Sequence, residues 1–304
     1  MTGSAPIPPA NAASGEPAGP NDSAIHAGFI DLHAHSTASD GSRPPAEVAR
    51  AAKAAGLSAF ALTDHDTIAG LADARAAAAL VGVRLINGVE LSAVEGDTET
   101  HVLGLHLGEF GELEHRLVEL REMRLTRAAR IVERLNGLGI PVTIDAVLHQ
   151  AAGGAVGRPH VARAMIAGGW ATDFREAFEK YLGNGRSAYV AKDRLSIVDA
   201  IGLIHRAGGL AVLAHPGGAC PRERVATLAS QGLDGIEVLH PSHSWDDSRR
   251  LDGYATDLEL VRSGGSDWHG AADGARALGM MRVPEQWLSE QVARVALRAS
   301  RRVA

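Results

Sequence analysis

The chain has 304 residues, a length that allows two domains of about 150 residues or one α/β barrel of about 250. Apolar residues make up 45% and charged residues 22%, as in ordinary globular proteins, which excludes a globally disordered chain. The 30 basic and 36 acidic residues give a net charge of −6, which argues against a protein that coats long duplex DNA through its overall field.

The cysteine content and the hydropathy indicate the compartment. Cys220 is the single cysteine, which excludes internal disulfides and cysteine-rich zinc modules and is typical of the reducing cytoplasm, where we expect the protein. No run of 18 apolar residues occurs, so we expect no membrane partner. Histidine is unusually frequent for an acidic chain, with 14 residues.

The predicted elements alternate after an N-terminal tail. Residues 1–27 are mostly Pro, Ala, Gly, Ser and Asn, and such a stretch cannot bury enough surface to order itself, so we expect a disordered tail. Short apolar runs then alternate with Ala-rich helical stretches, which predicts parallel βα units. The predicted strands are 29–32, 57–62, 84–90, 101–107, 210–214, 235–239 and 261–265, and the predicted helices are 45–55, 68–81, 197–207 and 222–231.

Residues 111–187 interrupt this alternation. Leu113, Leu117 and Leu120 begin a series of apolar positions at helical spacing, and more helical sequence follows as far as Tyr181. We therefore expect a small helical domain at 111–187 that caps the substrate site, inserted into a catalytic body formed by 28–110 and 188–304.

Histidines and carboxylates stand at the ends of the predicted strands. His33 and His35 follow the first strand, and in an extended segment residues i and i+2 point to the same side. In parallel α/β folds such strand ends converge on one rim, where active sites form. The side chains that we expect at this rim are His33, His35, Asp40, His65, Glu90, His101, His215, Asp267 and His269.

Nine nitrogen and oxygen ligands are more than one metal ion can bind while it keeps a coordination position open for water or substrate. They suit two or three ions such as Zn²⁺, Mn²⁺ or Fe²⁺, and Glu90 is the natural bridge between neighbouring ions. Such a cluster turns a bridging water into a hydroxide nucleophile and binds phosphoryl oxygens, which predicts metal-assisted phosphoester hydrolysis. Each residue alone has a simpler interpretation: Asp66 could cap a helix, and Asp40-Gly41 could be a turn.

The motifs resemble a known family. They are Asp31-Leu32-His33-Ala34-His35-Ser36, Ser39-Asp40-Gly41, Thr63-Asp64-His65-Asp66, Gly88-Val89-Glu90, Ala214-His215-Pro216 and Ser266-Asp267-Trp268-His269. Together they are similar to those of the PHP (polymerase and histidinol phosphatase) superfamily of metal-dependent phosphoesterases. The helical insertion, Gly157-Arg158-Pro159-His160 and His240-Pro241-Ser242-His243 resemble the branch of 3′,5′-nucleoside bisphosphate phosphatases and 5′→3′ exoribonucleases.

The resemblance implies an α/β fold, a distorted (β/α)₇ barrel, with three divalent metal ions in its mouth. Manganese is expected first, with Fe²⁺ or Zn²⁺ as alternatives. On the family pattern, His33 and His35 bind the first ion with Glu90 and Asp267, and Glu90 bridges to a second ion held by His101 and His215. Asp40, His65 and His269 hold the third, and Glu90, Asp267 and His65 serve catalysis around a metal-bridging hydroxide.

Three further residues are candidates for binding the substrate. Arg158 can recognise a second phosphate through its guanidinium, although it could also be a surface arginine in a turn. His240 or His243 can donate a proton to phosphate or to the leaving oxygen.

The expected reaction converts a nucleoside 3′,5′-bisphosphate into a nucleoside 5′-phosphate and phosphate. The same site could remove nucleotides stepwise from the 5′ end of short RNA. We expect no obligate protein partner. Two alternatives remain open: a phosphomonoesterase of the histidinol-phosphate type, and a metal-binding regulatory module without turnover. A third and more remote one is a proofreading module of a DNA polymerase, which would require a partner chain.

Overall fold

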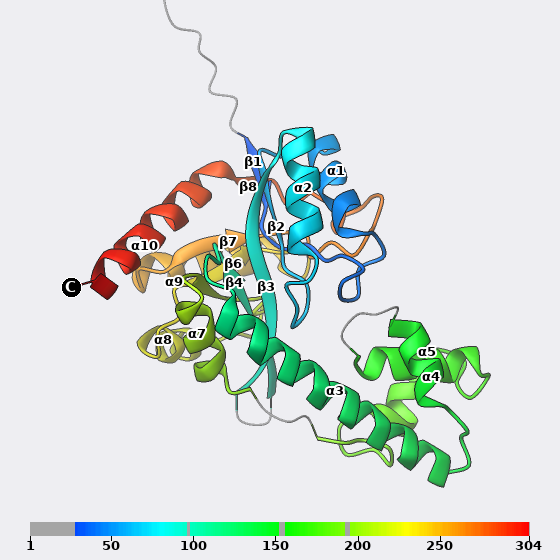
Figure 1. Cartoon of the computed structure of the whole chain (residues 1–304). Coiled ribbons are helices and arrows are strands. Elements are labelled where there is room, and N and C mark those ends of the chain that lie inside the picture. The colour runs from blue at the N-terminus through cyan, green and yellow to red at the C-terminus, as the bar shows by residue number, and fades with distance from the viewer. Residues whose placement is uncertain (1–27, 96–97, 152–155, 192–194, 304) are drawn as a thin grey trace, which may run out of the picture.

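The computed structural model describes residues 28–95, 98–151, 156–191 and 195–303, so the predicted tail at 1–27 lies outside the described residues. Eight strands form one sheet in the order β7-β6-β5-β4-β3-β2-β1-β8 (Figure 1). The strands are β1 (Phe29–Asp31), β2 (Ala59–Leu62), β3 (Arg84–Glu95), β4 (Thr98–Leu105), β5 (Leu210–Leu213), β6 (Gly235–Leu239), β7 (Val261–Gly264) and β8 (Val283–Pro284).

The sheet curls until β1 approaches β7. The backbone N–H of Leu32 donates to the carbonyl of Gly264 at 3.0 Å, and Ala34 forms a parallel bridge with Trp268 just beyond both strands. The result is a nearly closed barrel, which confirms the predicted α/β fold of the distorted (β/α)₇ type. β8, which pairs antiparallel with β1, adds an eighth strand that the sequence did not predict.

The prediction of parallel βα units does not hold at β4. This strand pairs antiparallel with both β3 and β5. Residues 96 and 97 alone separate β3 from β4 in the sequence, and a parallel crossover needs a dozen residues or more. Because β4 runs backwards, its first residues lie at the rim where the parallel strands end, and His101 therefore reaches the same place as the other predicted ligands.

Helices cover the outside of the barrel, and apolar side chains fill it. Ile30, Leu32, Leu103, Leu105 and Val212 are fully buried in one core inside the barrel. The covering helices are α1 (Pro45–Ala54), α2 (Leu71–Val81), α7 (Ile197–Arg206), α8 (Arg222–Ser230), α9 (Trp245–Asp257) and α10 (Glu285–Val303). Among the described residues no helix is both long enough and apolar enough to cross a membrane.

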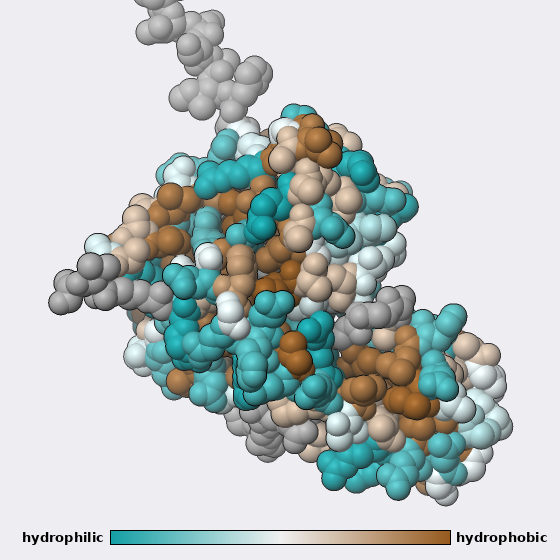
Figure 2. All heavy atoms as spheres, viewed as in Figure 1, coloured by the Kyte–Doolittle hydropathy of each residue, from teal (hydrophilic) through white to brown (hydrophobic). Residues whose placement is uncertain are grey.

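The insertion begins with the long helix α3 (Gly111–Gly137), which belongs to two cores. Its first half packs Leu113, Leu117 and Leu120 against the barrel, and its second half packs Ile131 and Leu135 against the other helices of the insertion. Those helices are α4 (Ile144–Ala151), α5 (Arg158–Ala167), α6 (Phe174–Ala177) and the π-helix η1 (Phe178–Leu182). The insertion lies beside the barrel at the far end of α3 (Figure 1), and Figure 2 shows hydrophobic residues gathered on it next to the barrel.

Candidate metal centre and adjoining cavity

Glu90 lies at the middle of the histidine cluster. Its side chain is buried on β3, and the imidazoles arrive from the ends of other strands. Its two oxygens lie within 3.3 Å of imidazole nitrogens of His33 (3.2 Å), His35 (3.2 Å), His65 (3.3 Å), His101 (2.9 Å) and His215 (3.0 Å). One carboxylate thus faces side chains from β1, β2, β4 and β5, as expected for a bridging group.

Asp267 and Asp40 extend the cluster on two sides. Asp267 Oδ1 lies 3.2 Å from His35 Nε2, and Asp40 Oδ1 lies 3.2 Å from His269 Nε2. His35, Asp40, His65 and His269 offer ligand atoms that all lie within 4.8 Å of one another. The structure therefore gathers all nine predicted side chains at one rim of the barrel.

The donor set fits divalent ions. Both ring nitrogens of His35, Nδ1 of His65 and Nδ1 of His101 are buried and form no hydrogen bond with the described residues. Buried polar atoms normally have a partner, and a group of orphaned imidazole nitrogens around shared carboxylates is the arrangement that Zn²⁺, Mn²⁺ or Fe²⁺ would satisfy.

Charges within the cluster shift the pKa values of its members. Burial alone would raise the pKa of Glu90, but His65, His33 and His101 hold it well below its usual range. Burial opposes protonation of His35 and His101, yet the neighbouring carboxylates of Asp267 and Glu90 raise the pKa of His35 to about 10, and the carboxylate of Glu90 raises the pKa of His101 to about 9. Burial lowers the pKa of His65 to about 4. The carboxylates are therefore anionic at neutral pH.

Two buried carboxylates outside the predicted set hold the cluster in place. Glu237, on β6, accepts from Nδ1 of His33 at 3.1 Å and from the backbone N–H of His215 at 2.7 Å. Asp64 accepts from the backbone and hydroxyl of Ser36 and from the hydroxyl of Ser39, each at 2.7 Å, and so fixes the loop that carries Asp40. Glu237 could have been singled out from the sequence as a carboxylate inside an otherwise apolar strand.

Asp66 does not cap a helix, in contrast to the simpler interpretation of its position. α2 begins at Leu71, later than predicted, with Gly70 as its N-cap residue. Asp66 instead pairs with Arg124 of α3 and accepts from the backbone N–H of Ser92 at 2.8 Å. The pair joins the barrel rim to the helix that leads into the insertion, which the local sequence could not reveal.

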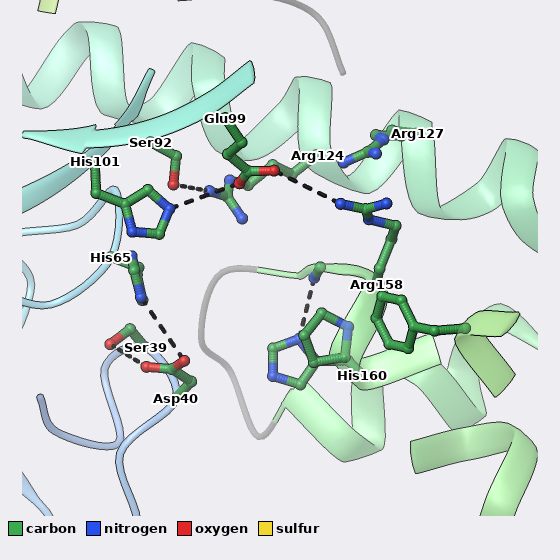
Figure 3. A pocket seen from close by; sticks show the side chains of 13 residues that line it. Ser39, Asp40, His65, Ser92, Glu99, His101, Arg124, Arg127, Arg158 and His160 are labelled. Atoms are coloured by element: carbon green, nitrogen blue, oxygen red, sulfur yellow. Dashed lines mark hydrogen bonds and ion pairs between the residues drawn. The ribbon is translucent and has the colours of Figure 1, made fainter. Parts of the chain in front are cut away.

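A cavity of about 200 Å³ opens beside the cluster, between the barrel and the insertion (Figure 3). Asp40, His65 and His101 line one end, Arg127 and Arg158 line the other, and Arg124 lies between them beside Ser92; Ser39, Glu99, Gly157, Pro159, His160 and Phe178 complete the wall. The pKa of Arg127 is lowered mainly by burial and further by the nearby positive charge of Arg158. Guanidinium groups so close together favour an anion between them.

Arg158 is anchored where α5 begins. Its Nη1 donates to the side-chain oxygen of Asn184 at 3.0 Å, and its guanidinium lies 5.7 Å from the ring centroids of both Phe178 and Tyr189. The insertion therefore holds this arginine toward the cavity rather than leaving it in an exposed turn.

His240 and His243 have different surroundings. The backbone N–H of Ser242 donates to Nδ1 of His240 at 3.1 Å, which leaves the proton of the neutral ring on Nε2, buried and 3.5 Å from Asp267 Oδ2. His243 donates from Nδ1 to the carbonyl of Val238 and accepts from the N–H of Gly217. A role of His243 in substrate binding would therefore require one of these backbone bonds to break.

Comparisons with known proteins agree with this arrangement. The PHP domain family model matches residues 31–224. The chain is 39% identical over 257 residues to a 3′,5′-nucleoside bisphosphate phosphatase of Chromobacterium violaceum, covering 82% of this chain and 90% of that protein. It is 38% identical over 245 residues to a 5′-3′ exoribonuclease of Haemophilus influenzae, covering 79% of this chain and 89% of that protein.

Solved structures resemble the whole fold. An amidohydrolase structure from Chromobacterium violaceum, with bound sulfate and no metal, superposes with a TM-score of 0.74 at 36% identity and covers 88% of this chain and 96% of its own. A protein from Bifidobacterium adolescentis, described by inference as a metal-dependent phosphoesterase, gives a TM-score of 0.76 at 30% identity with the same coverage.

Proposed function

The chain belongs to the PHP domain family, and we propose that it removes the 3′-phosphate of nucleoside 3′,5′-bisphosphates to give nucleoside 5′-phosphate and phosphate. The observation that carries this proposal is the cavity that joins the histidine cluster at one end to Arg127 and Arg158 at the other, with Arg124 between them. A substrate with two phosphates separated by a ribose suits a site with one phosphoryl-binding end and one cationic end.

The proposal includes short RNA as a second substrate. The same P–O3′ bond is broken in both cases, and in RNA the phosphate remains attached to the next nucleotide. The relatives named as a bisphosphate phosphatase and as an exoribonuclease support one site for both reactions.

We assign the cluster to three divalent ions, manganese first and Fe²⁺ or Zn²⁺ as alternatives. His33, His35, Glu90 and Asp267 would hold one ion, Glu90 with His101 and His215 a second, and Asp40, His65 and His269 the third. Bound there, the ions would supply Lewis acidity toward the phosphoryl oxygens and a hydroxide nucleophile at neutral pH. Among these ligands, Glu90, Asp267 and His65 are the proposed catalytic residues.

The remaining residues orient the substrate and move a proton. The guanidinium groups at the far end of the cavity would bind the 5′-phosphate and place the 3′-phosphate at the cluster, with Arg158 the main contact. His240 keeps its Nε2–H beside Asp267, from where it can donate to a phosphoryl or leaving oxygen.

Neither of the first two alternative functions accounts for the cationic end. A histidinol-phosphate-type monoester carries no second phosphate for Arg127 and Arg158 to bind. A regulatory module without turnover would not need a cavity that continues from the cluster to those arginines.

A substrate panel tests the proposal. The manganese-loaded protein should release phosphate from adenosine 3′,5′-bisphosphate much faster than from adenosine 3′-phosphate or histidinol phosphate, and should shorten 5′-phosphorylated RNA from its 5′ end. Efficient cleavage of histidinol phosphate alone, or no turnover by protein shown to contain its metals, would contradict it.

Manganese should stabilise the protein more at pH 8 than at pH 6. With pKa values of about 10 for His35 and about 9 for His101, both rings are protonated at neutral pH in the metal-free protein, so an ion must displace protons. Raising the pH lowers that cost. At one manganese concentration, about 100 times the dissociation constant at pH 8, we expect Tm to rise by about 5–10 °C at pH 8 and by less at pH 6. The rise is measured by thermal unfolding with and without a chelator. An equal or larger rise at pH 6 would contradict the expectation.

Glu237→Gln should weaken metal binding without removing a proposed ligand. The neutral amide no longer accepts a charged bond from Nδ1 of His33, so the ring is held less firmly and is less basic. We expect a loss of about 10- to 100-fold in manganese affinity, measured by competition with a fluorescent chelator. Glu223→Gln, an exposed substitution in the first turn of α8, is the control. Unchanged affinity in Glu237→Gln would exclude a positioning role.

A further inference from the structure

Glu99 lies between the two ends of the cavity. It stands on β4 two residues before His101, and in an extended strand both side chains therefore point to the same side. One of its carboxylate oxygens lies 3.6 Å from Nε2 of His101 and the other 3.6 Å from Nη2 of Arg158 (Figure 3). The same carboxylate thus faces both the histidine cluster and the arginine end.

A carboxylate in this place is unexpected for a site that binds a substrate with two phosphates. It repels both phosphates and partly neutralises Arg158, so a positive contribution must offset that cost. Among the described residues that line the cavity, Asp40 and Glu99 are the carboxylates, and Asp40 belongs to the proposed metal centre. Glu99, which pairs with His101 and Arg158, is therefore the cavity carboxylate outside the proposed metal centre, and a carboxylate can accept several hydrogen bonds at once, including one from a neutral donor on the substrate.

The chemistry of the substrate supplies such a donor. In a nucleoside 3′,5′-bisphosphate the ribose lies between the two phosphates, and its 2′-hydroxyl is adjacent to the carbon that carries the 3′-phosphate. A 3′-phosphate at the histidine cluster and a 5′-phosphate at Arg158 place the ribose along the wall that carries Glu99. Carboxylates are established acceptors for ribose hydroxyls in nucleotide sites.

We propose that Glu99 accepts a hydrogen bond from the substrate's 2′-hydroxyl and thereby selects ribonucleotides over deoxyribonucleotides. This inference rests on the proposed function and adds to it the identity of the sugar. The rival interpretation is a structural one, in which Glu99 only steadies Arg158 through their ion pair. That role would affect ribose and deoxyribose substrates equally, because both carry the 5′-phosphate.

The test compares kcat/KM for adenosine 3′,5′-bisphosphate and its 2′-deoxy counterpart with manganese-loaded protein. The wild type should prefer the ribonucleotide by about 10- to 100-fold, the range for a hydrogen bond to a charged group. In Glu99→Ala the ratio of the two kcat/KM values should fall to within about threefold of one. Without the carboxylate, the 2′-hydroxyl gains no hydrogen bond there and the deoxy sugar leaves no acceptor unpaired. Glu99→Gln keeps an oxygen acceptor without the charge and should give an intermediate ratio.

Glu95→Ala is the matched control. It removes another glutamate, at the end of β3, which pairs with Arg224 at 2.7 Å and does not itself line the cavity. Its sugar preference should equal that of the wild type. As a readout independent of turnover, calorimetry should show that adenosine 5′-phosphate binds more tightly than its 2′-deoxy form to the wild type, and that Glu99→Ala loses this difference.

The possible results separate the two proposals. Turnover of both substrates by the wild type without a sugar preference would overturn the role of Glu99 and leave the proposed function intact. An equal fall in both rates in Glu99→Ala, with the ratio preserved, would show the structural role instead. No turnover of either substrate by metal-loaded wild type would overturn the proposed function and this inference with it.

Discussion

Glu90→Gln is expected to lose turnover of adenosine 3′,5′-bisphosphate by about a thousandfold or more, equivalent to about 4 kcal/mol of transition-state stabilisation. The side chain keeps its size, but an amide offers one neutral oxygen where the carboxylate faces His33 and His35 with one oxygen and His101 with the other. It cannot bridge two cations. The loss should therefore appear in kcat and in the metal content.

Metal content by mass spectrometry and steady-state rates check this expectation together. Glu119→Gln, a substitution on the exposed pair that Glu119 forms with Arg116 on α3, is the control and should leave both values unchanged. Circular dichroism verifies that the Glu90 variant is folded. Full metal occupancy with a rate within about threefold of the wild type would remove Glu90 from the catalytic centre.

Arg158→Ala should separate substrates by their 5′-phosphate. We expect kcat/KM for adenosine 3′,5′-bisphosphate to fall by about 10- to 100-fold, the range for a lost charge-assisted hydrogen bond. Adenosine 3′-phosphate has no 5′-phosphate to bind, so its slower hydrolysis should change by no more than about threefold. The lysine variant keeps the charge without the planar pair of donors and should recover part of the loss.

Arg163→Ala provides the matched control for Arg158. Both arginines belong to α5, and Arg163 lies over the ring of Phe174, 5.9 Å from its centroid, rather than along the cavity. Its kcat/KM for both substrates should equal that of the wild type. Equal losses on both substrates in Arg158→Ala would mean that Arg158 supports the insertion rather than the 5′-phosphate.

The rim of polar residues was predictable because it depends on strand ends. His33, His65 and His215 follow short apolar runs, and parallel strands bring such ends together whatever the details of the helices. The place of His101 was also predicted, although the direction of its strand was not. A two-residue connection to β3 forces β4 to run antiparallel, and its first residues then meet the ends of its neighbours.

Contacts between segments that are distant in the chain could not be predicted from the sequence. Glu237 meets His33 across 204 positions, and Asp66 meets Arg124 across 58, so neither pair leaves a local pattern. The continuous helix α3, which packs Leu117 on the barrel and Leu135 on the insertion, likewise reads as one amphipathic helix. Its division between two cores depends on tertiary packing, which helical periodicity does not encode.

The most direct test of the central claim is the identity of the product that metal-loaded protein forms from adenosine 3′,5′-bisphosphate, separated by ion-exchange chromatography. A metal centre that receives the 3′-phosphate while Arg158 holds the 5′-phosphate predicts adenosine 5′-phosphate and one equivalent of phosphate. Adenosine 3′-phosphate as the product would place the phosphates the other way round and contradict the proposed orientation. No product from protein with full metal occupancy would contradict the proposed activity itself.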